Sequence, residues 1–278
     1  MGAQDISGGI EAMGFSRIVR SATRAGMAHS GAASVSQRGA FAPFSMVPFQ
    51  GGVMDASFSF SRWNPQGMPA SHFALGAAGL LKGRYGISGS AVYQTGAPEG
   101  GFAPSDLHIS LGVARGLSEH FSFGFGGHFV SSKLTASDRL SGFALDASVA
   151  FRTGGFSALV GLTQLGSASL GDDVYPMASS VTLAVSYGHN FGDHRVEGNV
   201  DADFYLARGV IVAGGLQYSW RETAFVRGGY HWASKDAVLP SFATVGAGAR
   251  VHGVTIDAAF LLGGPLSGTM TFGVGYGF

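Results

Sequence analysis

The chain has 278 residues, of which 46 are glycine and 22 are phenylalanine, and only 12% are charged. Its 17 basic and 17 acidic residues give a net charge of zero, which excludes the basic surface that nucleic-acid-binding proteins use. Cysteine is absent, so disulfides and thiolate metal sites are excluded, and no stretch of about 18 apolar residues could form a membrane helix.

Residues 1–48 lack the strand pattern of the rest of the chain. Residues 1–5 have neither the basic nor the apolar region of a signal peptide, so we expect the native gene to encode one upstream. Residues 14–34 are too polar to span a membrane and too irregular for a strand. We expect residues 1–48 to lie in the lumen of a barrel as a plug, and the alternative is a disordered periplasmic tail. The plug residues that we single out are Arg17, Arg20, Arg24, Gly26 and Met27.

Period-two alternation begins near residue 50 and continues to the end of the chain. Each run puts apolar side chains at every second position and small or polar ones between them, as a strand between lipid and a lumen requires. The expected strands cover residues 56–60, 73–81, 85–93, 107–113, 121–129, 143–151, 156–162, 181–187, 196–204, 210–220, 224–232, 245–251, 254–260 and 270–278.

The connectors between these runs alternate in length. Tight turns are expected at residues 82–84, 118–119, 153–155, 192–193, 221–222 and 252–253. Longer polar loops are expected at residues 64–71, 95–106, 131–140, 167–177, 234–240 and 263–267, with one short exception at residues 207–209. Short periplasmic turns and long extracellular loops are typical of outer-membrane barrels, whereas a soluble sandwich has no reason to alternate them.

The last run, residues 270–278, combines a fully apolar face with a face of glycine and threonine and ends on an aromatic residue. That pattern is typical of the closing strand of a bacterial outer-membrane barrel, and a core strand of a soluble β-sandwich is the alternative. We therefore predict that residues 49–278 form an all-β, transmembrane antiparallel β-barrel of about 14 strands, surrounded by the lipid of the bacterial outer membrane.

The opposite parity of the strands predicts the lumen. Its charged residues include Glu197, Asp201, Asp203, Arg227, Arg250 and Asp257, and its histidines include His108, His120 and His128. Two sets of internal pairs could form, Arg227 and Arg250 with Asp257, or the three plug arginines with Glu197, Asp201 and Asp203, because charges in a filled lumen need partners. Inward glycines such as Gly124 and Gly126 leave room for a second chain segment.

The sequence offers little support for catalysis or metal binding. The acidic positions 197, 201 and 203 could select cations or bind Ca²⁺, but they lack the spacing of a calcium loop. No HExxH or Gly-x-Ser-x-Gly motif is present, so a zinc site and a membrane hydrolase are disfavoured. We expect a non-enzymatic protein without cofactors.

Three stretches carry a resemblance to a known family. Residues 21–33 resemble an N-terminal Arg-Ala-x-Gly-Met-Gly segment, and residues 111–124 resemble an Ala-Arg-x-Leu-Ser hairpin. Near the end of the chain, residues 226–230 resemble a Leu-Arg-x-Gly-Tyr element and residues 256–260 resemble an Ile-Asp-Tyr-Ala-Tyr element. These stretches resemble the PorV/PorQ family of outer-membrane proteins associated with type IX secretion, itself similar to the FadL fatty-acid transporters. The resemblance implies a fourteen-stranded barrel with a plug that binds a secretion translocon, an attachment complex or the C-terminal domain of secreted cargo.

Three functions follow, in order of preference. The leading hypothesis is a docking barrel for secretion partners that act through the extracellular loops. The second is a FadL-like transporter of a hydrophobic ligand, which requires a continuous apolar inner pocket. That pocket would be lined by Leu80, Val92, Val130, Leu159, Ile211 and Phe225. The third is a diffusive porin, which requires an open lumen.

Overall fold

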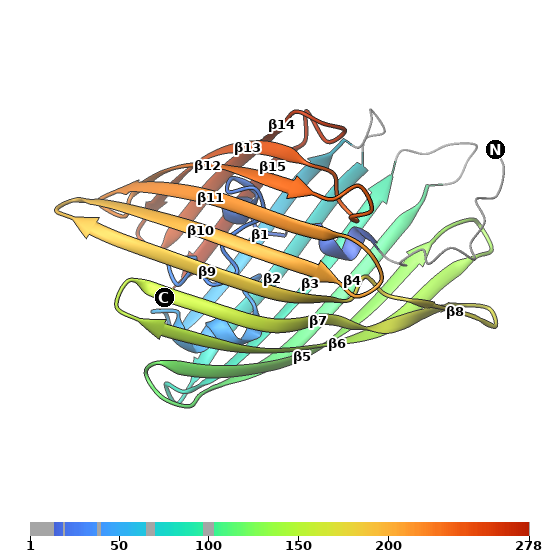
Figure 1. Cartoon of the computed structure of the whole chain (residues 1–278), viewed down its shortest axis with the longest axis horizontal. Coiled ribbons are helices and arrows are strands. Elements are labelled where there is room, and N and C mark those ends of the chain that lie inside the picture. Colours follow the sequence, from blue (N-terminus) through green and yellow to red (C-terminus); the bar gives the residue numbers. More distant parts are fainter. Residues whose placement is uncertain (1–13, 19, 38–39, 65–69, 97–102, 278) are drawn as a thin grey trace.

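The computed structural model describes residues 14–18, 20–37, 40–64, 70–96 and 103–277, and within them the chain is almost entirely β (Figure 1). The strands are β1 (Met54–Trp63), β2 (Ala70–Leu81), β3 (Tyr85–Gly96), β4 (Ser105–Gly116), β5 (Phe121–Lys133), β6 (Arg139–Thr153), β7 (Phe156–Leu170), β8 (Asp173–Pro176), β9 (Ser180–Phe191), β10 (His194–Tyr205), β11 (Val210–Trp220), β12 (Ala224–Ala233), β13 (Phe242–Val251), β14 (Val254–Leu262) and β15 (Met270–Gly277). The helices are η1 (Gly14–Arg17), α1 (Ala22–Ala25) and η2 (Phe44–Phe49). The interpretations of residues 1–13 and of the final Phe278 lie outside the described residues.

The described part of the chain contains no helix that is both long and apolar enough to span a membrane.

Fourteen of the strands close into one antiparallel barrel. Each pairs with the next in sequence, β7 pairs directly with β9, and β1 pairs with β15 from Asp55 opposite Gly277 to Arg62 opposite Met270. This confirms the predicted fold class, and each of the fourteen expected runs lies in a barrel strand. The strand β15 pairs with β1 on one side and with β14 on the other, as an ordinary wall strand does. This explains the pattern of the last run, because one face of a wall strand points to the lipid and the other to the lumen.

The short strand β8 is a correction to the prediction of a loop at residues 167–177. It pairs with the outer part of β7, from Ser167 opposite Pro176 to Leu170 opposite Asp173. This strand could not be predicted from the sequence, because four residues next to a turn are too few to show alternation. With β6 and β7, this hairpin extends past the other strands at one end of the barrel (Figure 1).

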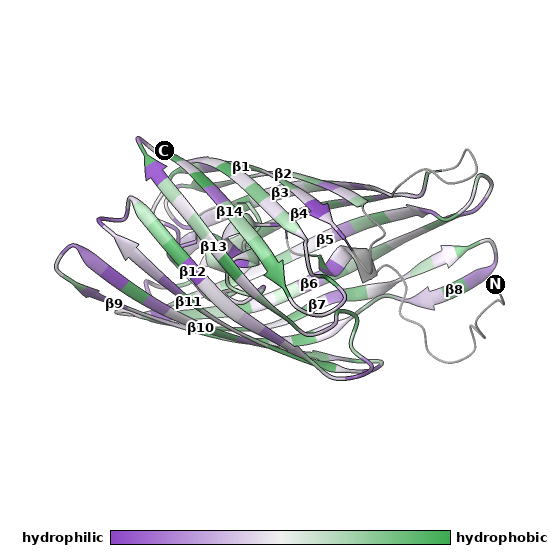
Figure 2. Ribbon diagram, turned by 90° about the horizontal axis from the view of Figure 1, so that it is seen from above, coloured by the Kyte–Doolittle hydropathy of each residue, from purple (hydrophilic) through white to green (hydrophobic). Residues whose placement is uncertain are grey.

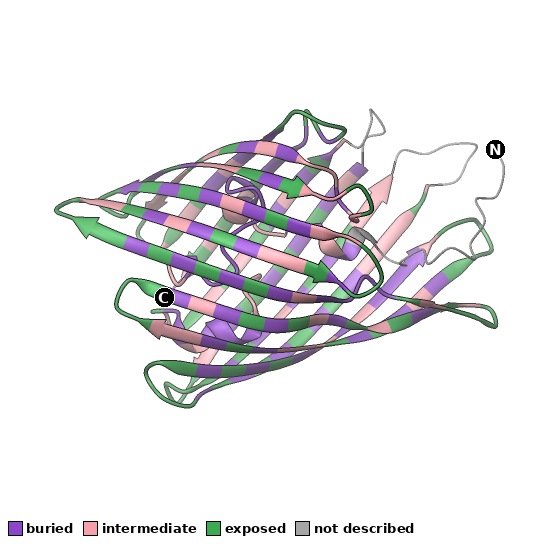
Figure 3. Ribbon diagram, in the orientation of Figure 1, coloured by how far each residue is buried: buried purple, intermediate pink, exposed green. Residues whose placement is uncertain are grey.

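The outside of the barrel is apolar and the inside is polar. Large side chains such as Leu75, Leu111 and Val226 point outward and are 60%, 67% and 62% exposed to solvent in the isolated protein. Buried and exposed residues alternate along nearly every strand (Figure 3), and green apolar bands follow the outward positions (Figure 2). A soluble sandwich would bury these side chains, so that alternative is excluded. The closed barrel with an apolar exterior belongs in the bacterial outer membrane.

One lumen assignment was wrong. His120 was expected to point inward, but it lies exposed in the turn before β5, where its Nδ1 is 2.9 Å from the carbonyl oxygen of Arg152. The alternation that places inward residues begins only at Phe121, because the turn at residues 118–120 interrupts the strand geometry.

Candidate functional site

The described part of the N-terminal segment lies against the inner wall of the barrel (Figure 1). Phe44 of η2 occupies a slot between two inward glycines of β4 and β5. A Cβ atom added to Gly126 would stand 2.0 Å from the Phe44 ring, and one added to Gly112 would stand 2.2 Å from it. At Gly124 the same atom would meet the Ser45 backbone nitrogen at 2.3 Å. Glycine is therefore needed at these wall positions to admit the segment.

A second group of inward glycines contacts the segment near α1. Met27 is fully buried, and a Cβ added to Gly215 or Gly229 would lie within 2.6 to 2.7 Å of its atoms. Gly26 lies against Gly246, where an added Cβ would be 2.9 Å from the Gly26 Cα. Two of the singled-out plug residues thus contact β11, β12 and β13. That the segment closes the lumen to solutes stays a prediction.

We expect Gly126→Leu to lower the stability of the folded barrel, because the new side chain would overlap the Phe44 ring. Overpacking of this kind costs ~1 to 3 kcal/mol. Gly127→Leu is the matched control, since a Cβ there meets only Leu145 and the Ala144 backbone at 3.8 to 3.9 Å. Urea unfolding of both variants in detergent checks the difference. Equal stability of the two variants would contradict the packing argument.

Asp201 holds a tight bend of the segment. Its carboxylate accepts hydrogen bonds from the backbone N–H of Gly31 at 3.0 Å and of Ala32 at 2.8 Å, and it pairs with Arg24 Nη2 at 3.2 Å. Arg24 also donates to the carbonyl oxygens of His29 at 2.6 Å and Ser30 at 3.3 Å. The buried carboxylate is therefore surrounded by donors from the segment, which offsets its desolvation.

The other two plug arginines do not contact the acidic ladder. Arg17 donates to the Ala178 carbonyl oxygen at 2.8 Å and lies 4.9 Å from the centre of the Tyr205 ring. Arg20 donates to Ser110 at 3.2 Å and lies 2.8 Å from His108. Of the three plug arginines, Arg24 alone has an ion pair with this ladder among the described residues, because parity tells which wall residues point inward but not at what height they lie.

Glu197 has a partner that the sequence interpretation missed. Arg195, two residues earlier on β10, lies 3.0 Å from the carboxylate, and the Ser34 hydroxyl of the segment donates to its other oxygen. Arg195 has the same inward parity as Glu197, so the sequence did contain the signal. Asp203 accepts a hydrogen bond from Thr182 on the neighbouring strand.

The expected contact between Arg227 and Asp257 is present. Their side chains lie 2.5 Å apart and are buried, and Arg227 Nε donates to Gln217 at 2.6 Å. Thr23 of α1 donates to the second Asp257 oxygen at 2.9 Å. Arg250 lies nearer the turn end and donates to Thr255 at 3.2 Å.

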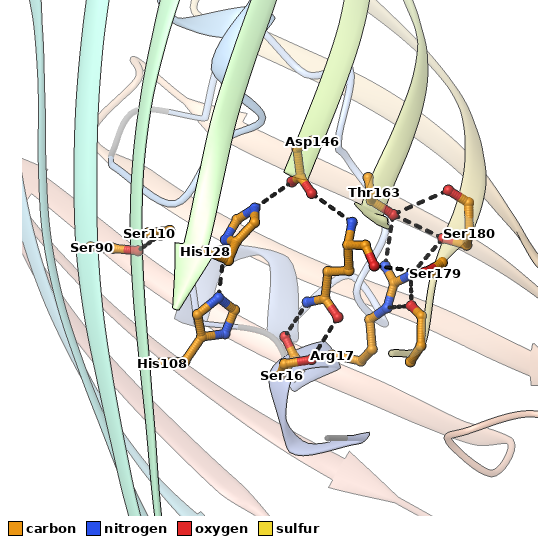
Figure 4. A network of polar contacts seen from close by, with 12 residues as sticks. Ser16, Arg17, Ser90, His108, Ser110, His128, Asp146, Thr163, Ser179 and Ser180 are labelled. Atoms are coloured by element: carbon orange, nitrogen blue, oxygen red, sulfur yellow. Dashed lines mark hydrogen bonds and ion pairs between the residues drawn. The ribbon is translucent and has the colours of Figure 1, made fainter. Parts of the chain in front are cut away.

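A chain of polar groups runs along the inner face of β4 to β7 beside η1 (Figure 4). His108 Nε2 lies 3.0 Å from His128 Nδ1, and His128 Nε2 lies 2.9 Å from Asp146. Asp146 also accepts from the backbone N–H of Gln164 at 2.6 Å, where the β6–β7 register shifts. The Ser16 hydroxyl donates to the Gln164 side chain at 2.6 Å. The inward positions of His108 and His128 could be predicted from strand parity, whereas their contact with each other was not predicted.

Two buried groups of the segment show the electrostatics of the lumen. Burial lowers the pKa of the Arg20 guanidinium from 12.5 to about 10, so it stays protonated at neutral pH. Burial, with the nearby His231 and Arg24, lowers the pKa of His29 well below its usual range, so this ring is neutral. The described residues contain no group of three or more His, Asp or Glu side chains placed to hold a metal ion.

A cavity remains beside the segment in the middle of the barrel. It encloses about 1110 Å³, part of it open to solvent. Arginine, aspartate and histidine side chains line it together with apolar ones, including Phe41, Phe44, Tyr205, Ile211 and Leu239. The cavity can therefore accommodate a molecule that carries both apolar and polar groups.

An apolar cluster lies above this cavity at the end with the long loops. Its buried members are Ile18, Ala28, Trp63, Ala70, Ala178, Tyr205, Ile211, Leu239, Phe242, Leu261 and Leu266. Four of them, Ile18, Tyr205, Ile211 and Leu239, also line the cavity. The cluster is thus an apolar region between the extracellular side and the lumen.

The continuous apolar pocket expected from six named residues is absent among the described clusters. Ile211 belongs to the cluster at the loop end, Val130 packs with Leu140, and Leu159 packs with Phe49. Leu80 packs near η2 in a fourth cluster. The six residues, Leu80, Val92, Val130, Leu159, Ile211 and Phe225, share an inward parity but lie at different heights, and the segment separates them.

The chain matches no protein-family model and no curated protein sequence. Solved structures share its fold. The monoaromatic hydrocarbon channel CymD superposes with a TM-score of 0.67 at 11% identity, over 94% of this chain and 98% of its own. The Pseudomonas putida toluene transporter TodX gives 0.60 at 12% identity, over 96% and 97%. A Pseudomonas aeruginosa FadL homologue gives 0.59 at 11% identity, over 93% and 98%.

The fold and the lumen together define an outer-membrane β-barrel with an internal N-terminal segment. At these identities the likeness establishes the fold alone, which is the one shared by CymD, TodX and the FadL homologue.

Proposed function

We propose that this chain is a non-enzymatic outer-membrane channel for small, largely apolar molecules, with its N-terminal segment as the gate. The apolar cluster at the loop end, directly above the mixed cavity, carries the proposal. An apolar molecule that leaves water is stabilised by contact with this cluster, and the cavity below can take its polar group. The names of CymD and TodX, a hydrocarbon channel and a toluene transporter, support the same substrate class.

The segment must move for a molecule to pass. The segment is held in the lumen by hydrogen bonds, such as those from Gly31 and Ala32 to Asp201, and by buried apolar side chains such as Met27 and Phe44. The wall strands, in contrast, are joined by a continuous series of strand pairs around the barrel. We therefore infer that the passage opens by a local displacement of this segment while the wall strands stay paired.

Uptake by whole cells tests the proposed channel. Cells with an intact outer membrane that express the chain should take up radiolabelled ethylbenzene faster than cells with an empty vector. Leu239→Asn, which puts an amide into the apolar cluster, should reduce this uptake severalfold. Leu206→Asn is the control, because Leu206 is an exposed loop residue. Uptake equal to that of the empty vector would overturn the proposal.

A docking role in type IX secretion is the second candidate. The sequence resemblance to PorV/PorQ proteins motivates it, and the hairpin of β7 and β8, where Val174 is 68% exposed, offers a surface beyond the lipid. Co-purification from native membranes tests this role. Recovery of the barrel without a translocon or secreted cargo would count heavily against it.

A further inference from the structure

Three arginines face one cavity at the end of the barrel that carries the short turns. Arg152 ends β6, Arg195 begins β10 and Arg250 lies near the end of β13. The cavity that they line encloses about 760 Å³, part of it open to solvent. Short turns lie on the periplasmic side in barrels of this class, so the cavity opens toward the periplasm.

The Arg195 guanidinium is held in place but keeps one donor without a partner. Its Nη1 donates to Asn190 at 3.0 Å and its Nη2 to Glu197 at 3.0 Å. Its Nε is buried and has no hydrogen-bond partner among the described residues. A Cβ at Gly188 would stand 2.0 Å from Nη2, so the glycine makes room for this placement. An unpartnered buried N–H of a charged group is a strong donor for an anion.

Two buried aromatic rings lie beside the other guanidiniums. Arg152 donates to the Phe49 carbonyl oxygen at 3.0 Å, and its guanidinium carbon lies 4.9 Å from the Phe49 ring centre. The corresponding distance from Arg250 to the Phe225 ring is 5.2 Å. Both rings also line the cavity. Charged donors and apolar surface are therefore presented side by side.

The charges around the cavity do not balance. Among its described lining residues Glu222 is the one acid, and it lies exposed in the turn after β11. Glu197 lies next to Arg195, just outside this lining. Basic side chains therefore outnumber acidic ones around the cavity, which favours an anion in this partly enclosed space.

We propose that this periplasmic cavity binds the anionic head of an amphiphile, a carboxylate or a phosphate, with the apolar part of the molecule against Phe49 and Phe225. Guanidinium groups suit both heads because their N–H donors match the geometry of the oxygens. The proposal stands on the turn-end geometry and is independent of the route that an apolar molecule takes from the loop end.

Calorimetric titration of the detergent-solubilised full chain with three six-carbon probes tests this site. Hexanoate and hexyl phosphate carry the anionic head, and hexanol has the same tail without charge. We expect at least one anion to bind roughly tenfold more tightly than hexanol, the gain expected for a charge-assisted hydrogen bond. The tighter anion identifies the head group. Equal binding of all three probes would overturn the proposal.

Matched double variants separate the site from general charge. Arg152→Gln combined with Arg250→Gln should remove the preference for the anions while hexanol binding stays unchanged. Lys82→Gln combined with Arg84→Gln removes the same charge from a turn at the same end, outside the cavity, and should keep the preference. Equal loss in both double variants would show a non-specific charge effect and refute the site. Ethylbenzene uptake, by contrast, tests the channel alone.

Discussion

Deletion of residues 1–48 should convert a barrel of low conductance into an open pore. The described residues of this segment contact β2 to β6 on one side of the lumen and β11 to β15 on the other. A fourteen-stranded barrel lies between small barrels, whose side chains fill the interior, and the larger porins that hold an aqueous channel. Without the segment, glycines such as Gly112 and Gly126 would line an empty wall. Single-channel recording in planar bilayers checks this expectation.

The matched control for this experiment is deletion of residues 1–13. All of the lumen contacts described above belong to residues 14–50, so this shorter deletion should leave the conductance unchanged. Both shortened chains must show the heat-modifiable migration of a folded barrel. If the deletion of residues 1–48 gives a folded barrel with no gain of conductance, neither the gate nor a plugged porin is tenable.

Much of this fold could be predicted from the sequence because the membrane imposes a simple rule. A strand between lipid and lumen must alternate, and an apolar residue such as Leu111 is followed by Gly112 on the inside. The inward glycines also predicted close contact with another segment, and Gly124 against the Ser45 backbone has that geometry. Where the rule ends, as at His120 in a turn, the prediction failed.

The partners of the lumen charges could be predicted only in part. Arg227 and Asp257 lie on strands separated by β13, and parity was enough to suggest that they meet. For Arg17 and Arg20 the height of an irregular segment within the lumen decides the partner, and no periodicity encodes that height. Neutral acceptors such as the Ala178 carbonyl oxygen also accept hydrogen bonds from an arginine. Because every residue has a backbone carbonyl, such partners cannot be recognised from the sequence.

The same limit applies to the proposed channel. Apolar inward residues could be recognised by parity, but the segment between them divides them into separate clusters. Among the clusters of described residues, only the one at the loop end combines residues of the wall, the loops and the segment, such as Ile211, Leu266 and Ile18. A ligand site built from three such sources depends on how loops fold back, which strand patterns do not predict.

Asp201→Ala should release the segment and destabilise the protein, which gives the sharpest test of the gate. The substitution removes the acceptor for two backbone N–H groups and leaves Arg24 without its carboxylate partner. Breaking a buried pair from one side costs ~3 to 5 kcal/mol. We expect urea unfolding to show a loss of this size, and trypsin to cleave at Arg24 in the variant but not in the wild type.

Asp193→Ala distinguishes this effect from the loss of any ion pair. Asp193 pairs with Arg221 at 2.8 Å in an exposed turn, with both side chains more than half exposed, and such pairs contribute only ~0 to 1 kcal/mol. This variant should keep the wild-type stability and its resistance to trypsin. If Asp201→Ala leaves the segment protected as well, Asp201 does not anchor it, and the glycine slots around Phe44 and Met27 must hold it by themselves.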